Sequence, residues 1–370
     1  MDRGTHRPRY SRIDAGGDRR RDPRLGDPCF PSAGSAAGVK FGLVSLDEAE
    51  GAILAHAANL PEGRIAKGMR LGPDDLHRLG EAGRTSVIAA RLDADDLPEN
   101  EAAARLGTVL TSNFVRADDA ATGRVNLFAE RNGVFVVDRA LVDCLNAVDS
   151  GITLATLAEH APVIAGQMVA TVKIIPLAVP NAAVEAAREI AAASAVFEVA
   201  PYRPHRVALV QTRLPSIKEG TLDKTRRVLE ARLAVSDSSV VQELRCDHDA
   251  DALAAALREL HPADLVVIFG ASAVIDVADV VPAAIGIAGG TVSHLGMPVD
   301  PGNLLLLGRF RDAPILGAPG CARSPKENGF DWVLNRLLAD VPVLPEDLRR
   351  MGVGGLLMEI PSRPQPRQER

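Results

Sequence analysis

Short apolar runs alternate with segments of helical periodicity along residues 206–340. The apolar runs predict strands, and the run at 264–269 is unbroken, as expected for a strand covered on both faces. The predicted strands lie at 206–211, 239–244, 264–269, 304–307 and 315–316, and the predicted helices at 222–234, 249–260, 279–289 and 324–338. This alternation predicts an α/β domain with a doubly wound, mostly parallel sheet. Ligands of such sheets bind beyond the carboxyl ends of the strands.

The pattern along residues 39–205 is less regular and predicts a mixed α+β region in front of this domain. Helices are expected at 46–60, 73–80 and 182–193, strands at 87–92, 134–138 and 167–177, and a turn with a short strand at 63–71. Lys173 lies inside one of these apolar strands and is interpreted as a solvated or rim lysine. The region contains no recognisable constellation of catalytic side chains.

Both ends of the chain lack hydrophobic periodicity. Residues 1–38 combine many arginines with aspartates, glycines and prolines, which predicts disorder because such a segment cannot offset the entropy of ordering. The segment is too acidic for a transit peptide, and a basic tail that touches an anionic partner is the alternative. Since periodic sequence begins at Val39, we expect a disordered or mis-assigned extension, with translation starting at Val39. Residues 341–370 indicate a C-terminal tail rich in Pro and Arg.

Composition narrows the classes of function. A length of 370 residues suggests two or three domains, and 46% hydrophobic but only 3% aromatic residues predict cores of Ala, Val, Leu and Ile. The net charge of −6 argues against binding to nucleic acid or a membrane surface, and no apolar run is suited to span a bilayer. The four cysteines are scattered, so neither a zinc site nor a disulfide framework is indicated, and a reducing cytoplasm fits best.

The first candidate for chemistry is the loop of small residues after the third strand of the domain, at 270–279. Gly270 and its neighbours would let a ligand approach the backbone closely. Asp276 and Asp279 follow beside the start of a helix, where two acids could hold Mg²⁺ through the phosphates of a nucleotide. On chemistry alone, a helix-capping role for either aspartate is the favoured alternative.

The second candidate is the loop at 316–327. Ser324 is predicted to cap the last helix, and Arg323 and Lys326 lie beside that cap. A helix end with two cations next to it is suited to bind a phosphate. The alternative is an ordinary capped surface helix whose basic residues are solvated. Cys321 has no histidine near it in the sequence and is interpreted as a small loop residue rather than a nucleophile.

A Pro-Gly turn at 296–303 is the third candidate. Asp300 and Asn303 flank this turn and could present polar groups to a heteroaromatic ring, although a tight turn with local side-chain bonds would use the same residues. Residues 247–249 open the helix after the second strand. Asp249 suits an N-cap there, and a metal or phosphate contact at the same edge of the sheet is the alternative.

In this order, the loops resemble the molybdopterin-binding domain family, which includes molybdopterin adenylyltransferase and molybdopterin molybdenumtransferase. The likeness is closest to bacterial members that are often fused to a molybdenum cofactor nucleotidyltransferase. Residues 39–205 resemble the front region of the molybdenumtransferase more weakly, chiefly at 63–68. The segments that carry the resemblance are Gly270-Ala271-Ser272-Ala273, Asp279-Val280-Val281-Pro282, Pro301-Gly302 before Leu304-Leu305, Pro319-Gly320 with Arg323-Ser324-Pro325-Lys326, Asp223-Lys224-Thr225, and Asp249.

The resemblance implies molybdopterin as ligand or substrate in molybdenum cofactor biosynthesis. It implies that three carboxylates hold Mg²⁺ against ATP or an adenylylated pterin, and that the loop of the second candidate binds the terminal phosphate of the pterin. The reaction would be adenylyl transfer or molybdate insertion, with the metal stabilising the transferring phosphoryl group. The implied metal ligands are Asp249, Asp276 and Asp279, the implied phosphate ligands are Arg323, Ser324 and Lys326, and the other implied contacts are Gly270, Ser272, Asp300, Gly302, Asn303, Pro319, Gly320, Asp223 and Thr225.

The loops also depart from the family pattern. Ala271 and Ala273 replace two positions of the glycine signature, and Asp300 and Asn303 stand where the family has lysines. Binding tolerates such changes better than catalysis, which needs tighter geometry. Two functions therefore stay open: an enzyme of molybdopterin activation, and a non-catalytic carrier that holds molybdopterin or the finished cofactor for a nucleotidyltransferase partner. A nucleotide pyrophosphatase of the same fold is a third interpretation. A homo-oligomer is expected, as is usual for relatives of this fold.

Overall fold

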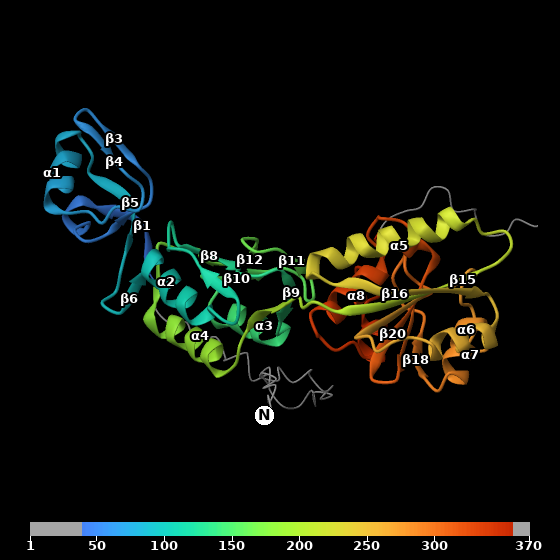
Figure 1. The fold of residues 1–370 in the computed structure, drawn as a ribbon. Helices are drawn as coiled ribbons and strands as arrows, with labels where there is room; N and C mark the ends of the chain where they lie inside the picture. The colour runs from blue at the N-terminus through green and yellow to red at the C-terminus, as the bar shows by residue number, and fades with distance from the viewer. Residues whose placement is uncertain (1–38, 358–370) are drawn as a thin grey trace, which may run out of the picture. The chain divides into compact units, whose positions relative to one another are not determined.

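The computed structural model describes residues 39–357, so the predictions for residues 1–38 and for the end of the predicted tail lie outside the described residues. Figure 1 shows the helices and strands. Contacts divide the chain into two compact units. Among the described residues, the first unit holds 39–130, 135–159 and 163–199, and the second holds 131–134, 160–162 and 200–357.

Small sheets of two to four strands and four α-helices occupy residues 39–201. The sheets have the strand orders β1-β5-β2, β10-β12-β8-β7, β11-β9-β14, β13-β6 and β3-β4. The strands are β1 (Lys40–Ser45), β2 (Ile53–Leu54), β3 (Ala58–Leu60), β4 (Gly63–Ile65), β5 (Ser86–Arg91), β6 (Asp96–Pro98), β7 (Val115–Ala117), β8 (Arg124–Ala129), β9 (Gly133–Val137), β10 (Ile152–Thr156), β11 (Pro162–Val163), β12 (Met168–Ile174), β13 (Ala178–Pro180) and β14 (Phe197–Pro201). The helices are α1 (Pro73–Glu81), α2 (Glu99–Leu110), α3 (Arg139–Val148) and α4 (Asn181–Ala193).

Two hydrophobic cores stabilise the first unit. One core joins the β1-β5-β2 sheet to α1 and includes Val44 and Leu79. The other contains Leu106 of α2 together with Phe135 and Phe197, whose ring centroids lie 5.6 Å apart. Each fully buried apolar side chain of this size contributes about 1.5–3 kcal/mol to folding. The cores therefore meet the expectation of a folded region in front of the α/β domain.

The predicted helix at 46–60 is wrong. This stretch forms a short 3₁₀ turn at Leu46–Glu48, followed by β2 and β3. Gly51 has a φ of +76°, which turns the chain, and Ile53 then pairs with Ala90 of β5. The tertiary pairing thus overrides the helical preference of the alanines and leucines. Elsewhere in the first unit, helix α1 matches the prediction, whereas α2 and α3 were not predicted.

The second unit is built on a six-stranded sheet with the order β16-β15-β17-β20-β19-β18. Strand β15 runs parallel to β16 and β17, and β17 runs parallel to β20. Strand β19 is antiparallel to both β20 and β18, so the sheet is mixed rather than fully parallel. The strands are β15 (Arg206–Arg213), β16 (Ser239–Asp247), β17 (Leu265–Phe269), β18 (Thr291–Leu295), β19 (Leu306–Phe310) and β20 (Ala313–Ala318).

Helices cover both faces of this sheet. Alternate side chains of β15 point to opposite faces, so Val207 and Leu209 join one core while Ala208 and Val210 join the other. Figure 1 shows α5 on one side of the sheet and α6 and α7 on the other. The helices are α5 (Glu219–Leu233), α6 (Ala250–Arg258), α7 (Val280–Ile287), α8 (Gly329–Leu338) and α9 (Pro345–Arg350). The predicted alternation of strands and helices from β15 to α7 is confirmed.

Three local predictions in the second unit need correction. The last long helix, α8, begins at Gly329 rather than at residue 324. Strand β18 was not predicted, and its run of Thr, Val, Ser, His and Leu is half polar because it lies at the edge of the sheet. The segment predicted as a tail contains α9, whose Leu348 is fully buried.

The cysteines differ in state. Cys246 and Cys321 are free thiols, but Cys144 is disulfide-bonded. The sequence did not indicate a disulfide at this position. Spacing alone cannot reveal such a bond, because it depends on which segments the fold brings together. Within residues 39–357, no helix is long and apolar enough to cross a membrane.

Candidate functional site

Four parallel strands of the second unit end at the same edge of the sheet, here called the carboxyl edge. These ends are Arg213 of β15, Asp247 of β16, Phe269 of β17 and Ala318 of β20. The loops that follow β16, β17 and β20 contain most of the residues that the sequence proposes for a ligand. Because parallel strands place such loops side by side, this edge is the candidate site.

Thr212, the next-to-last residue of β15, joins two of these loops. Its Oγ1 accepts the backbone N–H of Ala271 at 2.7 Å and lies 2.8 Å from His248 Nδ1. The Thr212 side chain is fully buried, and which partner donates in its hydrogen bond with His248 Nδ1 depends on the tautomer of the imidazole. A β-carbon at Gly270 would lie 4.0 Å from His248 Cε1, so the ring borders the small-residue loop.

Arg323 reaches from the loop after β20 to the end of β17 and to helix α5. One terminal nitrogen of its guanidinium donates to Thr225 Oγ1 at 2.6 Å and approaches Gln211 Oε1 at 3.5 Å. The other terminal nitrogen donates to the backbone oxygen of Gly270 at 3.0 Å. The guanidinium carbon lies 5.1 Å from the ring centre of Phe269. Arg323 therefore joins the two loops that the sequence proposed for phosphate and for the close approach of a ligand.

The charge of Arg323 is not balanced by a carboxylate in the described part of the chain. Its partners are a hydroxyl, an amide oxygen and a backbone oxygen, and none of the ion pairs among residues 39–357 includes it. Burial lowers the pKa of its guanidinium from the ordinary value, because desolvation disfavours the charged form. A half-buried cation without a counter-charge favours an anionic ligand nearby.

Arg232 of α5 fixes the course of the loop after β20. It donates to the backbone oxygens of Ala322 and Ser324, both at 2.8 Å. It also forms an ion pair with Asp331 at 2.5 Å. Its bonds leave the side chain of Lys326 exposed beside the loop. The sequence did not single out Arg232, because its partners are mainly backbone oxygens, which leave no pattern of charges to recognise.

The start of α8 does not provide the free helix end that the sequence suggested at Ser324. Asn328 is the N-cap, and it forms a capping box with Asp331. The first N–H groups of the helix are occupied: Gly329 donates to Pro301 O at 2.9 Å, and Phe330 donates to Asn328 Oδ1 at 3.1 Å. Ser324 precedes the helix and only accepts the N–H of Lys326 through its side chain, at 3.3 Å. The prediction of a phosphate site at the N-terminus of a helix that begins at residue 324 is therefore wrong.

The Pro-Gly loop packs against the start of α8. Gly302 has a φ of +139°, and a β-carbon there would lie 2.7 Å from the backbone nitrogen of Gly329. Asp300 is half-buried, and its backbone exchanges hydrogen bonds with Gly355 and Leu357. Burial raises the pKa of the Cys321 thiol, and the charge of Asp300 adds to that effect. The loops at 296–303 and 319–328 are thus close neighbours.

The three carboxylates proposed for Mg²⁺ all bind backbone N–H groups. Asp249 caps α6 and accepts from Asp251 and Ala252, each at 3.0 Å. Asp279 caps α7, with one oxygen accepting from Val280 at 2.7 Å and the other from Ile275 at 3.1 Å. Asp276 accepts the N–H of Ala278 at 2.8 Å.

These bonds establish the local structural role of the carboxylates. Across the described residues, no group of three or more His, Cys, Asp or Glu side chains is arranged to hold a metal ion. The three aspartates therefore do not fit Mg²⁺ as a set in this arrangement, and a metal role for any one of them stays a prediction.

The remaining predicted contacts differ in accessibility. Asp223 forms an ion pair with Arg245 at 2.7 Å, and Thr225 is buried and bonded to Arg323. The other residues fall into two groups: Ser272, Asn303 and Gly320 are exposed, whereas Pro319 is buried. A β-carbon at Gly320 would meet no atom within 4 Å, so the backbone there is open to a ligand.

Sequence inspection underrated Gln211, Thr212 and His248. Gln211 and Thr212 are fully buried polar residues at the end of an apolar strand, and this change from apolar to polar is a signal that could have pointed to them. His248 was considered only as part of the helix opening, yet its ring is held at the carboxyl edge by Thr212.

Comparisons with known proteins find matches among solved structures but not among sequences. The sequence matches no family model and no curated protein. Two solved structures of molybdopterin biosynthesis MoeA proteins from Pyrococcus horikoshii are similar to this chain. The first is 12% identical, with 84% of this chain and 75% of that chain covered and a TM-score of 0.27. The second is 11% identical, with 66% and 79% covered and a TM-score of 0.26.

Proposed function

We propose that the second unit binds molybdopterin at the carboxyl edge of its sheet, in the service of molybdenum cofactor biosynthesis. The observation that carries this proposal is the position of Arg323, which donates to Gly270 O and Thr225 Oγ1. All three residues belong to segments that resemble the molybdopterin-binding family. They are far apart in the sequence, and the fold brings them into contact at one edge of the sheet.

The chemistry of the edge suits a phosphorylated pterin. Arg323 supplies a half-buried positive charge without a carboxylate partner among the described residues, and Lys326 is an exposed cation in the same loop. Nε2 of His248, the ring nitrogen that Thr212 does not contact, can hydrogen-bond to a ring substituent. The open backbone at Gly320 leaves room for close approach. A positive charge, a hydrogen-bonding side chain and open space are the three features that suit a phosphate attached to a heteroaromatic ring.

A specific observation favours a carrier over an activating enzyme. Both oxygens of Asp279 and one oxygen each of Asp249 and Asp276 already accept backbone N–H groups. A carrier needs only the phosphate and ring contacts, whereas adenylyl transfer would also need Mg²⁺ and ATP. In the carrier proposal, the chain holds molybdopterin or the finished cofactor for a separate nucleotidyltransferase. A homo-oligomeric state and a cytoplasmic location stay predictions from the sequence.

The test compares two arginines at opposite edges of the same sheet, each of which donates to backbone oxygen and lies near a phenylalanine ring. Arg311 donates to the backbone oxygens of Leu260 and Arg258, and its guanidinium carbon lies 4.9 Å from the ring centre of Phe310. Arg323→Ala should weaken molybdopterin binding on the order of tenfold to a hundredfold, because a charge-assisted bond contributes ~1.5–3 kcal/mol. Arg311→Ala should lower the free energy of unfolding about as much as Arg323→Ala does. It should leave the affinity for molybdopterin unchanged.

Equilibrium titration of each full-length variant with molybdopterin gives the dissociation constants, and urea unfolding gives the matching stabilities. Equal affinity of wild type and Arg323→Ala would contradict the proposed site. Equal loss of affinity in both variants would show that the effect is one of general destabilisation.

A further inference from the structure

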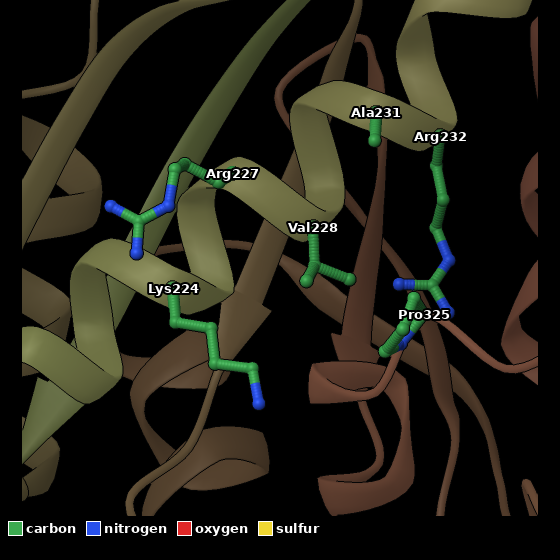
Figure 2. Close-up of a pocket in the computed structure, with 6 residues that line it drawn as sticks. All are labelled: Lys224, Arg227, Val228, Ala231, Arg232 and Pro325. Atoms are coloured by element: carbon green, nitrogen blue, oxygen red, sulfur yellow. The ribbon is translucent and has the colours of Figure 1, made fainter.

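A pocket of about 300 Å³ lies between α5 and the loop that follows β20. Figure 2 shows its lining, which consists of Lys224, Arg227, Val228, Ala231, Arg232 and Pro325. The lining residues of α5 recur at spacings of three and four, so they share one face of the helix. The volume is at the lower end of the range for sites that bind small organic molecules. No residue of this pocket except Arg232 takes part in the contacts described above.

The lining combines two kinds of chemistry. Val228, Ala231 and Pro325 provide an apolar wall, and Lys224 and Arg227 provide positive charge. In Figure 2 the charged ends of Lys224 and Arg227 lie to the left and Val228 and Pro325 lie to their right, with the Arg227 guanidinium turned away from Pro325. No acidic residue lines the pocket. A ligand that fits this wall has a flat apolar part and, at one end, a negative charge.

Four acidic side chains of α5 and α8 are paired with arginines. The pairs are Glu219 and Asp223 with Arg245 at 2.6 and 2.7 Å, Glu230 with Arg226 at 2.8 Å, and Asp331 with Arg232 at 2.5 Å. Within residues 39–357, by contrast, neither Lys224 nor Arg227 belongs to an ion pair. The charge of Arg232 is compensated by Asp331, so the net positive charge of the pocket comes from Lys224 and Arg227.

We propose that this pocket binds a small heteroaromatic phosphate, with Lys224 and Arg227 on the phosphoryl group and the ring against Val228, Ala231 and Pro325. Charge-assisted hydrogen bonds to a phosphate are the strong contacts in such a site, and the apolar wall adds ring burial. A nucleotide and a phosphorylated pterin share this chemistry. The inference goes beyond the proposed function, because nucleotide binding here requires no molybdopterin at the carboxyl edge.

The test uses the double variant Lys224→Ala/Arg227→Ala of the full chain. The probes are adenosine monophosphate, adenosine and molybdopterin, each titrated calorimetrically. A charge-matched control, Lys40→Ala/Arg64→Ala, removes two exposed cations of the first unit. Wild type should bind at least one of the two phosphorylated probes, with adenosine on the order of tenfold weaker than its monophosphate. The double variant should lose on the order of tenfold to a hundredfold in affinity for the phosphorylated probe, and the control should lose nothing.

The arms of this experiment separate the ligand sources. If the double substitution weakens the affinity for adenosine monophosphate, the pocket is a nucleotide site. If it weakens only the affinity for molybdopterin, the pocket is a second contact for the pterin phosphate. Unchanged affinity for both phosphorylated probes overturns the inference. A shift of oligomeric state in sedimentation, without a change in affinity, would overturn it in favour of a protein interface. The proposed function is judged separately, by Arg323→Ala.

Discussion

At the carboxyl edge of the second unit, single side chains join loops that are distant in the sequence. Arg323 bonds to Gly270, and Thr212 bonds to both His248 and Ala271. The sequence identified Arg323 and Gly270 because they lie in segments that resemble a known family. It could not identify the partners, because a buried hydroxyl or a backbone oxygen that accepts one bond leaves no periodic or charged signature along the chain.

Asp279 provides a prediction at this scale. Asp279→Asn keeps one acceptor for Val280 but replaces the oxygen that accepts the N–H of Ile275 with a donor. The unfolding free energy should therefore fall by about 0.5–1.5 kcal/mol, the usual contribution of one hydrogen bond. Asp276→Asn is the matched control, because the side chain of Asp276 accepts only the N–H of Ala278 and asparagine keeps an oxygen for that bond. The unfolding free energy of this variant should not change.

The same two variants separate the carrier from the enzyme. A carrier predicts that neither substitution alters the affinity for ATP in the presence of Mg²⁺, measured by equilibrium dialysis. Weaker Mg²⁺-dependent ATP binding in Asp279→Asn, with Asp276→Asn unaffected, would contradict the purely capping role of Asp279. It would also favour the enzyme of molybdopterin activation over the carrier.

At the scale of elements, the strand and helix rhythm of β15 to α7 followed from hydrophobic periodicity, but the start of α8 did not. Ser324 and Asn328 are both good N-caps by residue type, and each is followed by an acid three residues later. Asn328 is the cap because the Pro-Gly loop reaches Gly329. That choice depends on tertiary contact, which a local pattern cannot show.

The contact between that loop and α8 gives a second prediction. Gly302→Ala would place a β-carbon 2.7 Å from the nitrogen and 2.8 Å from the α-carbon of Gly329, at a φ that side chains rarely adopt. The unfolding free energy should fall by about 1–3 kcal/mol through overpacking, and by more if the left-handed φ adds strain. Gly320→Ala is the control, since nothing lies within 4 Å of its β-carbon.

Urea unfolding of both variants measures this difference, and the control should stay within about 0.5 kcal/mol of wild type. Equal stability of Gly302→Ala and Gly320→Ala would show that the Pro-Gly loop does not approach α8 as described.

At the scale of the molecule, the sequence predicted a second half with an α/β sheet and a first half of mixed character. The sheet of the second unit has helices on both faces, but its β19 reverses direction, so the sheet is mixed. The hairpin between β19 and β20 turns at Arg311, which has a positive φ of 54° and so gave no glycine signal in the sequence. The first unit was harder to predict because its strands are short and its alanine-rich segments suit either helix or core.

Hydrogen–deuterium exchange of the full chain, with and without molybdopterin, tests the central claim most directly. Amide exchange reports local opening residue by residue, so a ligand should slow it where the ligand contacts the backbone. The account predicts slower exchange in the loops at 270–279 and 319–328 of the second unit and unchanged exchange in residues 39–130 of the first. Protection that is absent from both loops, or that appears only in the first unit, would contradict molybdopterin binding at the carboxyl edge.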